Sequence, residues 1–262
     1  MIEVIGLTKG YGDFLAVQDL SFSVKPGEVL GLVGPNGAGK TTTLRCITGI
    51  IPPTRGVIRI ADINLSEDPV SAKRQLAFFP DEPRLFEHLS VWQHLVFTAR
   101  LYQLKHYEER GHALLQQLEM GDKEKLMPGE LSRGMKQKLA LACGLLHEPR
   151  VILFDEPLTG LDPGGIRSMK ATMLRLAREG AAIILSSHLL SLLEEVCSHV
   201  LILKNGQKVI DGTLTHIRET YSVGGETTLE DVFFRATEGT PPPLPDQPAQ
   251  PSTQSETPPP LP

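Results

Sequence analysis

Cysteine is scarce in this sequence, and the few cysteines form no metal-binding or redox pattern. The 262 residues include only Cys46, Cys143 and Cys197, which are far apart and make neither a CxxC pair nor a Cys/His cluster. A chain of this length buries enough surface to fold without disulfides or a structural metal. The scarcity therefore predicts a protein of a reduced, cytosolic compartment.

Long hydrophobic runs are absent as well. The most apolar segments, residues 29–33, 151–154 and 181–185, are much shorter than the roughly 20 residues that a helix needs to cross a bilayer. Residues 1–5 show no basic stretch that leads into an apolar one, so we expect no signal peptide. Any role at a membrane would therefore depend on a partner protein.

Neither sign of charge dominates the sequence. Lysine and arginine together number 26 against 31 aspartates and glutamates, which leaves a formal net charge of -5. Proteins that bind nucleic acid usually carry a basic patch or stripe that follows the phosphate backbone. The balance of charge therefore argues against a DNA or RNA partner.

What the sequence does contain is an alternation of strands and helices. Short runs rich in Val, Ile and Leu alternate with longer segments of helical period, which is typical of a largely parallel sheet covered by helices. Residues 2–7 and 16–24 instead alternate apolar and polar side chains, as antiparallel strands with one solvated face do. Residues 91–104 and 107–118 have the pattern of amphipathic helices. We therefore predict an α/β fold with a helical insert.

The last part of the sequence differs sharply in composition. Nearly half of the prolines fall in residues 240–262, together with Ser, Thr and Gln and almost no large apolar side chain. Such a segment cannot bury a core and is expected to be disordered or polyproline-like. It is either a solvated spacer or a ligand for an SH3-like groove. We predict one domain at residues 1–238, with a helical subdomain inserted at roughly residues 81–134, and a disordered tail at residues 239–262.

The strongest local motif is rich in glycine. Residues 34–41 read Gly-Pro-Asn-Gly-Ala-Gly-Lys-Thr, between the apolar strand 29–33 and a predicted helix at residues 41–48. This is the P-loop pattern in its required context, in which glycine lets backbone N–H groups converge on phosphate oxygens. Lys40 would reach the β- and γ-phosphates and the Thr41 hydroxyl would bind Mg²⁺, whereas the alternative is a chance glycine-rich turn. The predicted phosphate-binding residues are Gly34, Pro35, Asn36, Gly37, Ala38, Gly39, Lys40, Thr41 and Thr42.

A second apolar strand ends in two carboxylates. Residues 151–154 are followed directly by Asp155 and Glu156. At the end of a strand, Asp155 suits the Mg²⁺ shell, and Glu156 can polarise the water that attacks the γ-phosphate. The same pair could be a helix N-cap and a solvated neighbour, because Pro157 could open a helix. The P-loop in the same chain favours the catalytic interpretation.

In their order, these motifs resemble those of the ATP-binding subunits of ABC transporters. Residues 131–135, Leu-Ser-Arg-Gly-Met, stand just before the acidic strand, where this family carries a signature that usually reads Leu-Ser-Gly-Gly-Gln. Asp162 lies in what resembles the D-loop, His188 is similar to the switch histidine, and Tyr11 is placed like the aromatic residue that stacks on adenine. The resemblance covers nearly the whole chain, from about residue 2 to residue 234.

Each of these residues, taken alone, has a simpler explanation. Tyr11 could be a half-buried packing residue, because tyrosine offers both an apolar face and a polar hydroxyl. His188 could cap the next helix or titrate in solvent. Ser132 and Gly134 could be an ordinary N-cap and turn before a helix at residues 136–146. The shared order and spacing of the motifs favour the functional interpretation.

Two positions depart from the usual motifs of the family. Asp81 occupies the place of the Q-loop glutamine, and it could face Mg²⁺ or water although it is shorter and charged. The signature has Arg133 and Met135 where Gly and Gln are commoner, while Ser132 and Gly134 are retained. This form of the signature resembles that of ATPases in exporter or efflux systems more than that of nutrient importers.

The resemblance implies a P-loop NTPase core of the RecA-like type and an ATP site shared by two subunits. ATP and Mg²⁺ would bind between the P-loop of one subunit and the signature of the other. Glu156, His188 and Lys40 would be catalytic. Residues Thr41, Asp155 and Asp81 would face the metal, and Tyr11, Ser132, Arg133, Gly134, Met135 and Asp162 would complete the nucleotide site.

The implied partners are a transmembrane permease subunit and a second ATPase subunit, in a homodimer or a heterodimer at the cytoplasmic face of the membrane. No nucleic-acid partner is expected. One alternative is an ABC ATPase that acts on ribosomes or DNA, although such proteins usually fuse two cassettes or insert long coiled coils. Another is a P-loop nucleotide kinase or a regulatory NTP-binding module, which would need a P-loop but no signature.

Overall fold

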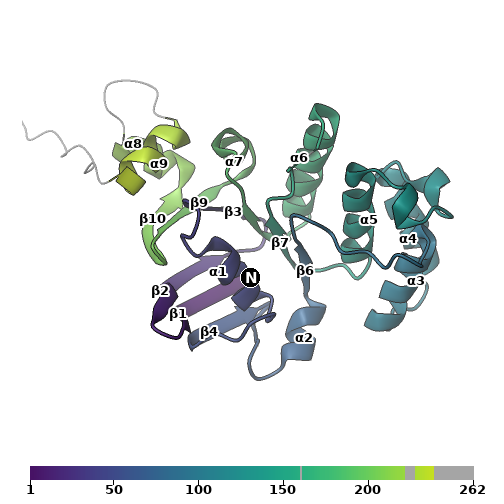
Figure 1. The fold of residues 1–262 in the computed structure, drawn as a ribbon, viewed down its shortest axis with the longest axis horizontal. Coiled ribbons are helices and arrows are strands. Elements are labelled where there is room, and N and C mark those ends of the chain that lie inside the picture. The colour runs from purple at the N-terminus through teal and green to yellow at the C-terminus, as the bar shows by residue number, and fades with distance from the viewer. Residues whose placement is uncertain (160, 222–227, 239–262) are drawn as a thin grey trace, which may run out of the picture.

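A six-stranded sheet forms the centre of the molecule (Figure 1). The computed structural model describes residues 1–159, 161–221 and 228–238. The strands lie in the order β10-β9-β3-β8-β7-β6, and neighbouring strands are parallel except for β9 and β10. The sheet consists of β3 (Val29–Val33), β6 (Leu76–Phe79), β7 (Val151–Asp155), β8 (Ala182–Ser186), β9 (His199–Lys204) and β10 (Gln207–Thr213).

The central strands are apolar because both faces of the sheet are covered. Every side chain of β3 and β8 is buried. Alternate residues of β3 enter two different cores, since Leu30 packs with the N-terminal part of the chain and Val29 with the later helices. The parallel register aligns Asp155 of β7 with Ser186 of β8, and Ser186 with Leu32 of β3. The loop after β3 and the acidic end of β7 therefore lie at the same edge of the sheet.

A second, antiparallel sheet covers one face of the first, with α1 (Lys40–Ile47) in the same core. Its strands lie in the order β2-β1-β4-β5, and Leu7, Leu20 and Ile58 from three of them are buried together. The antiparallel strands predicted from alternation are confirmed, although they are longer than predicted. The predicted residues 2–7 and 16–24 fall in β1 (Ile2–Tyr11) and β2 (Phe14–Val24), and the sheet also contains β4 (Arg55–Ile60) and β5 (Ile63–Asn64).

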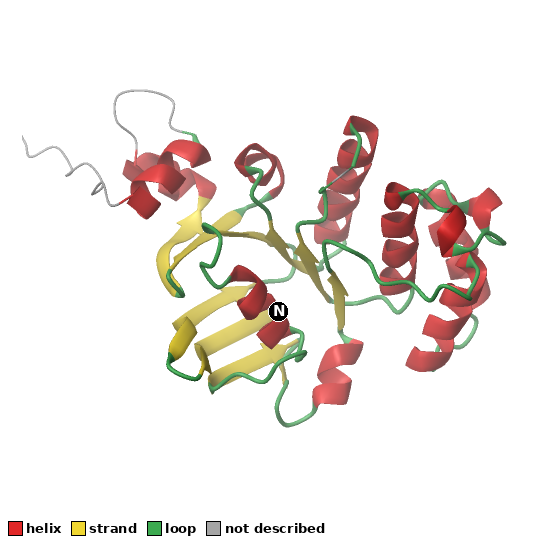
Figure 2. Cartoon of the chain, in the orientation of Figure 1, coloured by secondary structure: helices red, strands yellow, loops and turns green. Residues whose placement is uncertain are grey.

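Three helices pack together beyond β6, at one end of the sheet (Figure 2). They are α3 (Val91–Tyr102), α4 (Tyr107–Gln117) and α5 (Arg133–Leu145), and α5 packs on both others and on β6. Helix α3 begins where Ser90 and Gln93 form a capping box. Helix α5 begins three residues earlier than predicted, because the Ser132 hydroxyl caps its first turn by accepting a hydrogen bond from the Met135 N–H at 3.3 Å.

The remaining helices complete the cover of the central sheet and the C-terminal part. One of them is α6, which begins at Pro163, so Pro157 opens no helix. The alternative in which Asp155 and Glu156 are a helix N-cap and its solvated neighbour is therefore wrong. Within the described part of the chain, no helix is long and apolar enough to span a bilayer. The tail predicted at residues 239–262 lies outside the described residues. The remaining helices are α2 (Pro69–Arg74), α6 (Pro163–Arg178), α7 (Leu190–Val196), α8 (Leu214–Tyr221) and α9 (Leu229–Glu238), and short 3-10 turns lie at Gly121–Lys123 and Pro128–Glu130.

Candidate functional site

The glycine-rich segment connects the buried end of β3 to the first turn of α1. Gly39 is the N-cap of α1 with a φ of 102°, a left-handed conformation that glycine adopts without strain. A Cβ at Gly39 would lie 2.5 Å from the carbonyl oxygen of Ala16, and one at Gly34 would lie 2.5 Å from that of Leu203. The loop therefore passes too close to β2 and β9 at these two points for a larger residue.

We expect Gly39→Ala to destabilise the fold by at least about 2 kcal/mol, because the change combines a left-handed backbone with a clash against a backbone carbonyl. Urea unfolding followed by circular dichroism measures the loss. Gly180→Ala is a matched control, since Gly180 has a φ of 97° but its Cβ would meet nothing within 4 Å. An equal loss of stability in both variants would show that the contact with Ala16 contributes nothing.

Lys40 lies inside the P-loop. Its Nζ donates hydrogen bonds to the carbonyl oxygens of Gly34 at 2.6 Å and Pro35 at 3.1 Å. Burial lowers the pKa of Lys40, and the nearby carboxylates of Glu156 and Asp155 oppose this shift. The structure thus brings the predicted phosphate-binding lysine next to both acidic residues at the end of β7.

Asp155 lies at the end of β7, beside Lys40 and Thr41. Burial raises the pKa of Asp155, and the Ser186 hydroxyl, the Lys40 ammonium and the Thr41 hydroxyl oppose this shift. Ser186 is close to Asp155, yet its buried hydroxyl makes no hydrogen bond of ordinary geometry with the described residues. A carboxylate and two hydroxyls in one place match the oxygen ligands that Mg²⁺ prefers.

The site has few protein groups that could hold a metal. Among the described residues, no three His, Cys, Asp or Glu side chains gather closely enough to bind an ion by themselves. Mg²⁺ commonly binds through one or two protein oxygens and completes its shell with substrate phosphates and water. The pairing of Thr41 with Asp155 beside the P-loop fits this mode of binding.

Glu156 and His188 are in direct contact. The Nδ1 atom of His188 lies 2.8 Å from Oε2 of Glu156, and the backbone N–H of His188 donates to the same oxygen at 3.3 Å. The backbone N–H of Glu156 donates to the carbonyl oxygen of Ser186 at 2.9 Å. Glu156 has a φ of 51°, which is uncommon for a residue with a side chain and occurs often at functional sites. The structure therefore joins the predicted base to the predicted switch histidine.

The hairpin between β1 and β2 presents two aromatic side chains, one of which lies near the P-loop. Tyr11 and Phe14 lie opposite each other at the turn, and they are 51% and 63% exposed. Phe14 lines a hollow of about 410 Å³ that also includes Gly37 of the P-loop. The Lys9 Nζ lies 5.0 Å from the centroid of the half-exposed Tyr11 ring, so a base stacked on this ring would have to use its other face or displace Lys9. Phe14 is a further candidate that the family motifs do not reveal, and its signal in the sequence is its position across the turn from Tyr11.

The signature begins α5 and faces a hollow of about 650 Å³. Ser132 is exposed and also caps the helix, so the simpler explanation of an N-cap is correct without excluding a second role. Asp162 caps α6 by accepting a hydrogen bond from the Gly165 N–H at 2.7 Å. Among the described residues that line the hollow, none belongs to the P-loop or to the end of β7. The predicted residues that line it are Ser132, Arg133, Gly134, Met135 and Asp162.

Asp81 is held by Arg133. Its Oδ1 accepts a hydrogen bond from Nη2 of Arg133 at 3.1 Å. Asp81 and Asp155 both line a groove of about 860 Å³ that runs along β6 and α3. The metal-binding role of Asp81 stays a prediction, and it would require Asp81 to leave Arg133.

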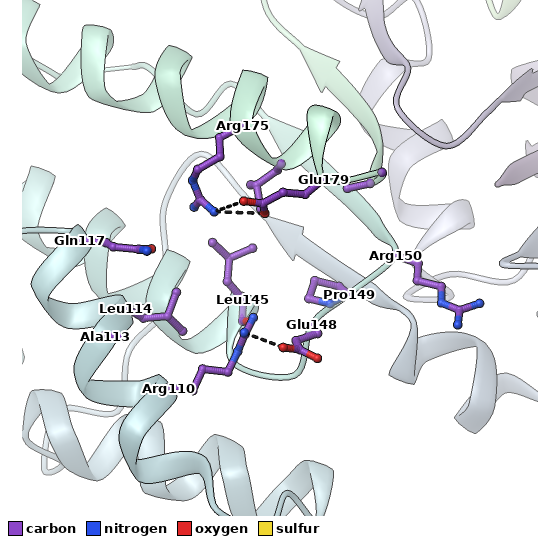
Figure 3. Close-up of a pocket in the computed structure, with 13 residues that line it drawn as sticks. Arg110, Ala113, Leu114, Gln117, Leu145, Glu148, Pro149, Arg150, Arg175 and Glu179 are labelled. Carbon is purple, nitrogen blue, oxygen red and sulfur yellow. Dashed lines mark hydrogen bonds and ion pairs between the residues drawn. The ribbon is translucent and has the colours of Figure 1, made fainter.

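A separate cavity of about 540 Å³ lies between α4, the end of α5 and the end of α6 (Figure 3). Its charged side chains neutralise one another, because Arg110 pairs with Glu148 at 2.6 Å and Arg175 with Glu179 at 2.9 Å. Arg150 points away from these pairs (Figure 3). None of the predicted site residues lines this cavity, so it is distinct from the candidate nucleotide site.

The P-loop between β3 and α1, with the acidic end of β7 beside it, defines the class of P-loop nucleotide-binding proteins. Comparison with known proteins gives the family. The family model described as ABC transporter matches residues 17–159. The chain is 35% identical to the ABC-type transporter ATP-binding protein EcsA of Bacillus subtilis (strain 168), over 90% of this chain and 96% of that protein.

Two further comparisons agree. The chain is 32% identical to the SkfA peptide export ATP-binding protein SkfE of the same strain, over 80% of this chain and 88% of that protein. The solved structure of an ATP binding subunit of an ABC transporter matches with a TM-score of 0.85 and 36% identity, over 90% of this chain and 99% of that one. The chain belongs to the ABC transporter family, as an ATP-binding subunit.

This membership confirms the predicted α/β fold with a P-loop NTPase core. It also confirms the predicted function, in which the chain binds and hydrolyses ATP and powers transport through a separate transmembrane partner. The alternative of a P-loop kinase is wrong. A transporter subunit is favoured over an ATPase that acts on ribosomes or DNA.

Proposed function

We propose that two ATPase subunits, either two copies of this chain or one copy and a related chain, enclose MgATP head to tail. The observation that carries the proposal is that the hollow lined by the signature and Asp162 includes neither the P-loop nor Glu156, so the two halves of the predicted site do not meet within one subunit. Ser132 and Arg133 are exposed and can meet a second molecule. A second subunit would therefore supply the half of the ATP site that each subunit lacks.

The P-loop half of the site would bind the substrate. Backbone N–H groups within residues 34–42, which all but Pro35 possess, and the Lys40 ammonium would contact the phosphates, and the Tyr11 ring would stack on adenine. Mg²⁺ held by the Thr41 and Asp155 oxygens would neutralise charge on the phosphates. The close placement of Lys40, Thr41 and Asp155 supports this assignment.

Glu156 would act as the base for the attacking water. Both contacts from His188 fall on Oε2, which leaves Oε1 of Glu156 to accept the proton of the water. The water oxygen would bond to the γ-phosphorus while the bond from that phosphorus to the β–γ bridging oxygen breaks, so that ADP and phosphate are released. His188 would keep the carboxylate of Glu156 oriented toward the water.

The groove that includes Asp81 is the surface that we assign to the transmembrane partner. Phe86, Phe97 and Leu101 are exposed apolar side chains on its walls. An apolar groove with aromatic walls suits the apolar face of a short helix from a partner. Because Asp155 lines the same groove, a partner bound there would lie close to a predicted metal ligand.

The working unit is proposed to span residues 1–238, with a helical subdomain at roughly residues 81–134. We place it at the cytoplasmic face of the membrane, bound through its transmembrane partner and without a nucleic-acid partner. The direction of transport is proposed to be export. The exporter-like signature and the similarity to SkfE, whose name states peptide export, support this direction.

Mixing two inactive variants tests whether two subunits share the ATP site. Lys40→Ala damages the P-loop half and Ser132→Arg blocks the signature half, so each variant alone is expected to lack ATPase activity. In an equal mixture, about half of the dimers contain one copy of each variant. Each of these mixed dimers has one intact site out of two, so about one quarter of the wild-type activity should return. Phosphate release by the full-length chain measures the recovery.

A second mixture is the control for this experiment. Lys40→Ala and Glu156→Gln damage the same half of the site, so no mixed dimer of these two variants contains an intact site. Recovery in this control would contradict the two-subunit arrangement. Failure of the first mixture to recover activity would contradict a site shared by two copies of this chain.

A further inference from the structure

Arg133 and Asp81 are the two charged departures from the usual motifs, and they contact each other. They are 52 residues apart in the sequence, and the Nη2 and Oδ1 atoms are separated by 3.1 Å. Arg133 stands where the signature commonly has glycine, and Asp81 stands where the Q-loop commonly has glutamine. A positive charge introduced at one motif is therefore matched by a negative charge at the other.

The ion pair connects two surfaces with different partners. Arg133 lines the hollow of the signature, and Asp81 lines the groove that we assign to the transmembrane partner. The first surface faces the second ATPase subunit in the proposed dimer. The Arg133 side chain thus forms its ion pair with Asp81, whose carboxylate lines the groove and not the signature hollow.

The other charged groups of the signature hollow have partners nearby. Lys138 pairs at 2.6 Å with Glu119, which lines the same hollow. Asp162 is engaged at the N-terminus of α6 by the Gly165 N–H. Among the described cations that line the hollow, Arg133 alone has its carboxylate partner outside it. Arg133 is therefore the cation that an anion entering the hollow could recruit.

We propose that Arg133 is a further phosphate-binding residue of the ATP site, that it contacts the γ-phosphate of ATP held by the partner subunit, and that Asp81 competes with this phosphate. The proposal rests on the two-subunit site proposed above. Arg133 and Asp81 are 44% and 47% exposed, and an ion pair so exposed is weak. A guanidinium can bind a phosphate through two parallel hydrogen bonds, and a phosphate carries more negative charge than a carboxylate. The γ-phosphate therefore displaces Asp81 from Arg133.

ATP-driven dimerisation of the full-length Glu156→Gln chain measures this competition, because the bound ATP is not consumed. The ATP concentration that gives half-maximal dimer is read by analytical ultracentrifugation. Arg133→Gln is expected to raise this concentration by about 10-fold or more, since a charge-assisted contact with phosphate is lost. Asp81→Asn is expected to lower it by about two- to five-fold, the range of an exposed ion pair.

The double variant separates competition from simple structural damage. Arg133→Gln with Asp81→Asn is expected to match Arg133→Gln alone, because the proposed competition by Asp81 requires Arg133. Arg133→Lys should give an intermediate value, since it keeps the charge and loses the paired hydrogen bonds. ATP binding to the dilute monomer should not change with Arg133→Gln, because the contact is made to the partner's ATP.

Arg59→Gln is the matched control. Arg59 and Glu3 form an ion pair of 3.0 Å on the antiparallel sheet, with exposures of 48% and 31%, so this variant removes a similar pair away from the signature. It should leave the dimerisation curve unchanged. An unchanged curve for Arg133→Gln, or weaker dimerisation for Asp81→Asn, would overturn the role of Arg133. If Glu156→Gln itself does not dimerise with ATP, the two-subunit site fails instead.

Discussion

Glu156→Gln is expected to slow ATP hydrolysis by about 10²- to 10⁴-fold, the usual contribution of a general base, while ATP binding is retained. Glutamine keeps the shape of the side chain and can still contact His188, but its amide cannot take a proton from water. Phosphate release at saturating ATP measures the rate. Analytical ultracentrifugation with ATP should show the variant trapped as a dimer.

Glu179→Gln provides the control for the loss of a carboxylate. Glu179 pairs with Arg175 at 2.9 Å at the end of α6, beside the cavity of Figure 3 and away from the P-loop. Its rate should stay within about two-fold of wild type, as expected for an exposed ion pair. A wild-type rate in Glu156→Gln would remove Glu156 from the role of base.

Lys40→Ala is expected to lower the affinity for ATP by about 10- to 100-fold, because the charge-assisted hydrogen bonds to the phosphates are lost. In the structure, the Lys40 Nζ is held in the P-loop by the carbonyl oxygens of Gly34 and Pro35. Isothermal titration calorimetry on the purified chain measures the affinity. Circular dichroism shows whether the variant keeps its fold.

Lys73→Ala is a matched control for Lys40→Ala. The Nζ of Lys73 also donates to a backbone carbonyl, that of Gly49 at 3.1 Å, but Lys73 lies in α2 and outside the P-loop. Its affinity for ATP should equal that of the wild type. Undiminished affinity in Lys40→Ala would contradict the assignment of residues 34–41 as the P-loop.

The parts of the site that could be predicted from the sequence are those set by local constraints. The glycine-rich segment between a buried strand and a helix predicts a tight loop, and the structure places Gly34 and Gly39 where a side chain would clash. Asp155 and Thr41 are predicted to bind the same Mg²⁺, and in the structure Asp155 lies beside Lys40 and Thr41. The contact between Glu156 and His188, by contrast, depends on the adjacent positions of β7 and β8 in the sheet, which the sequence does not state.

Other features depend on packing between distant segments and leave little local signal. The pair of Arg133 with Asp81 requires the loop after β6 to lie against the first turn of α5, which no spacing in the sequence states. The position of Phe14 beside Gly37 depends on how the β1–β2 hairpin lies over the P-loop. Helix α5 is a different case, since it begins earlier than its apolar period predicts because of the Ser132 cap, which is a local signal.

The sequence by itself determined the predicted chemistry of this protein. The residue types in the P-loop and in residues 155–156, the backbone conformations that glycine allows and the positions where strands end are all local properties of the chain. Only the tertiary structure decided that residues 132–135 and Asp162 share one hollow that no residue of the P-loop lines. The reason is that distances between segments far apart in the chain are set by how sheets and helices pack, and not by the residues on either side of a motif.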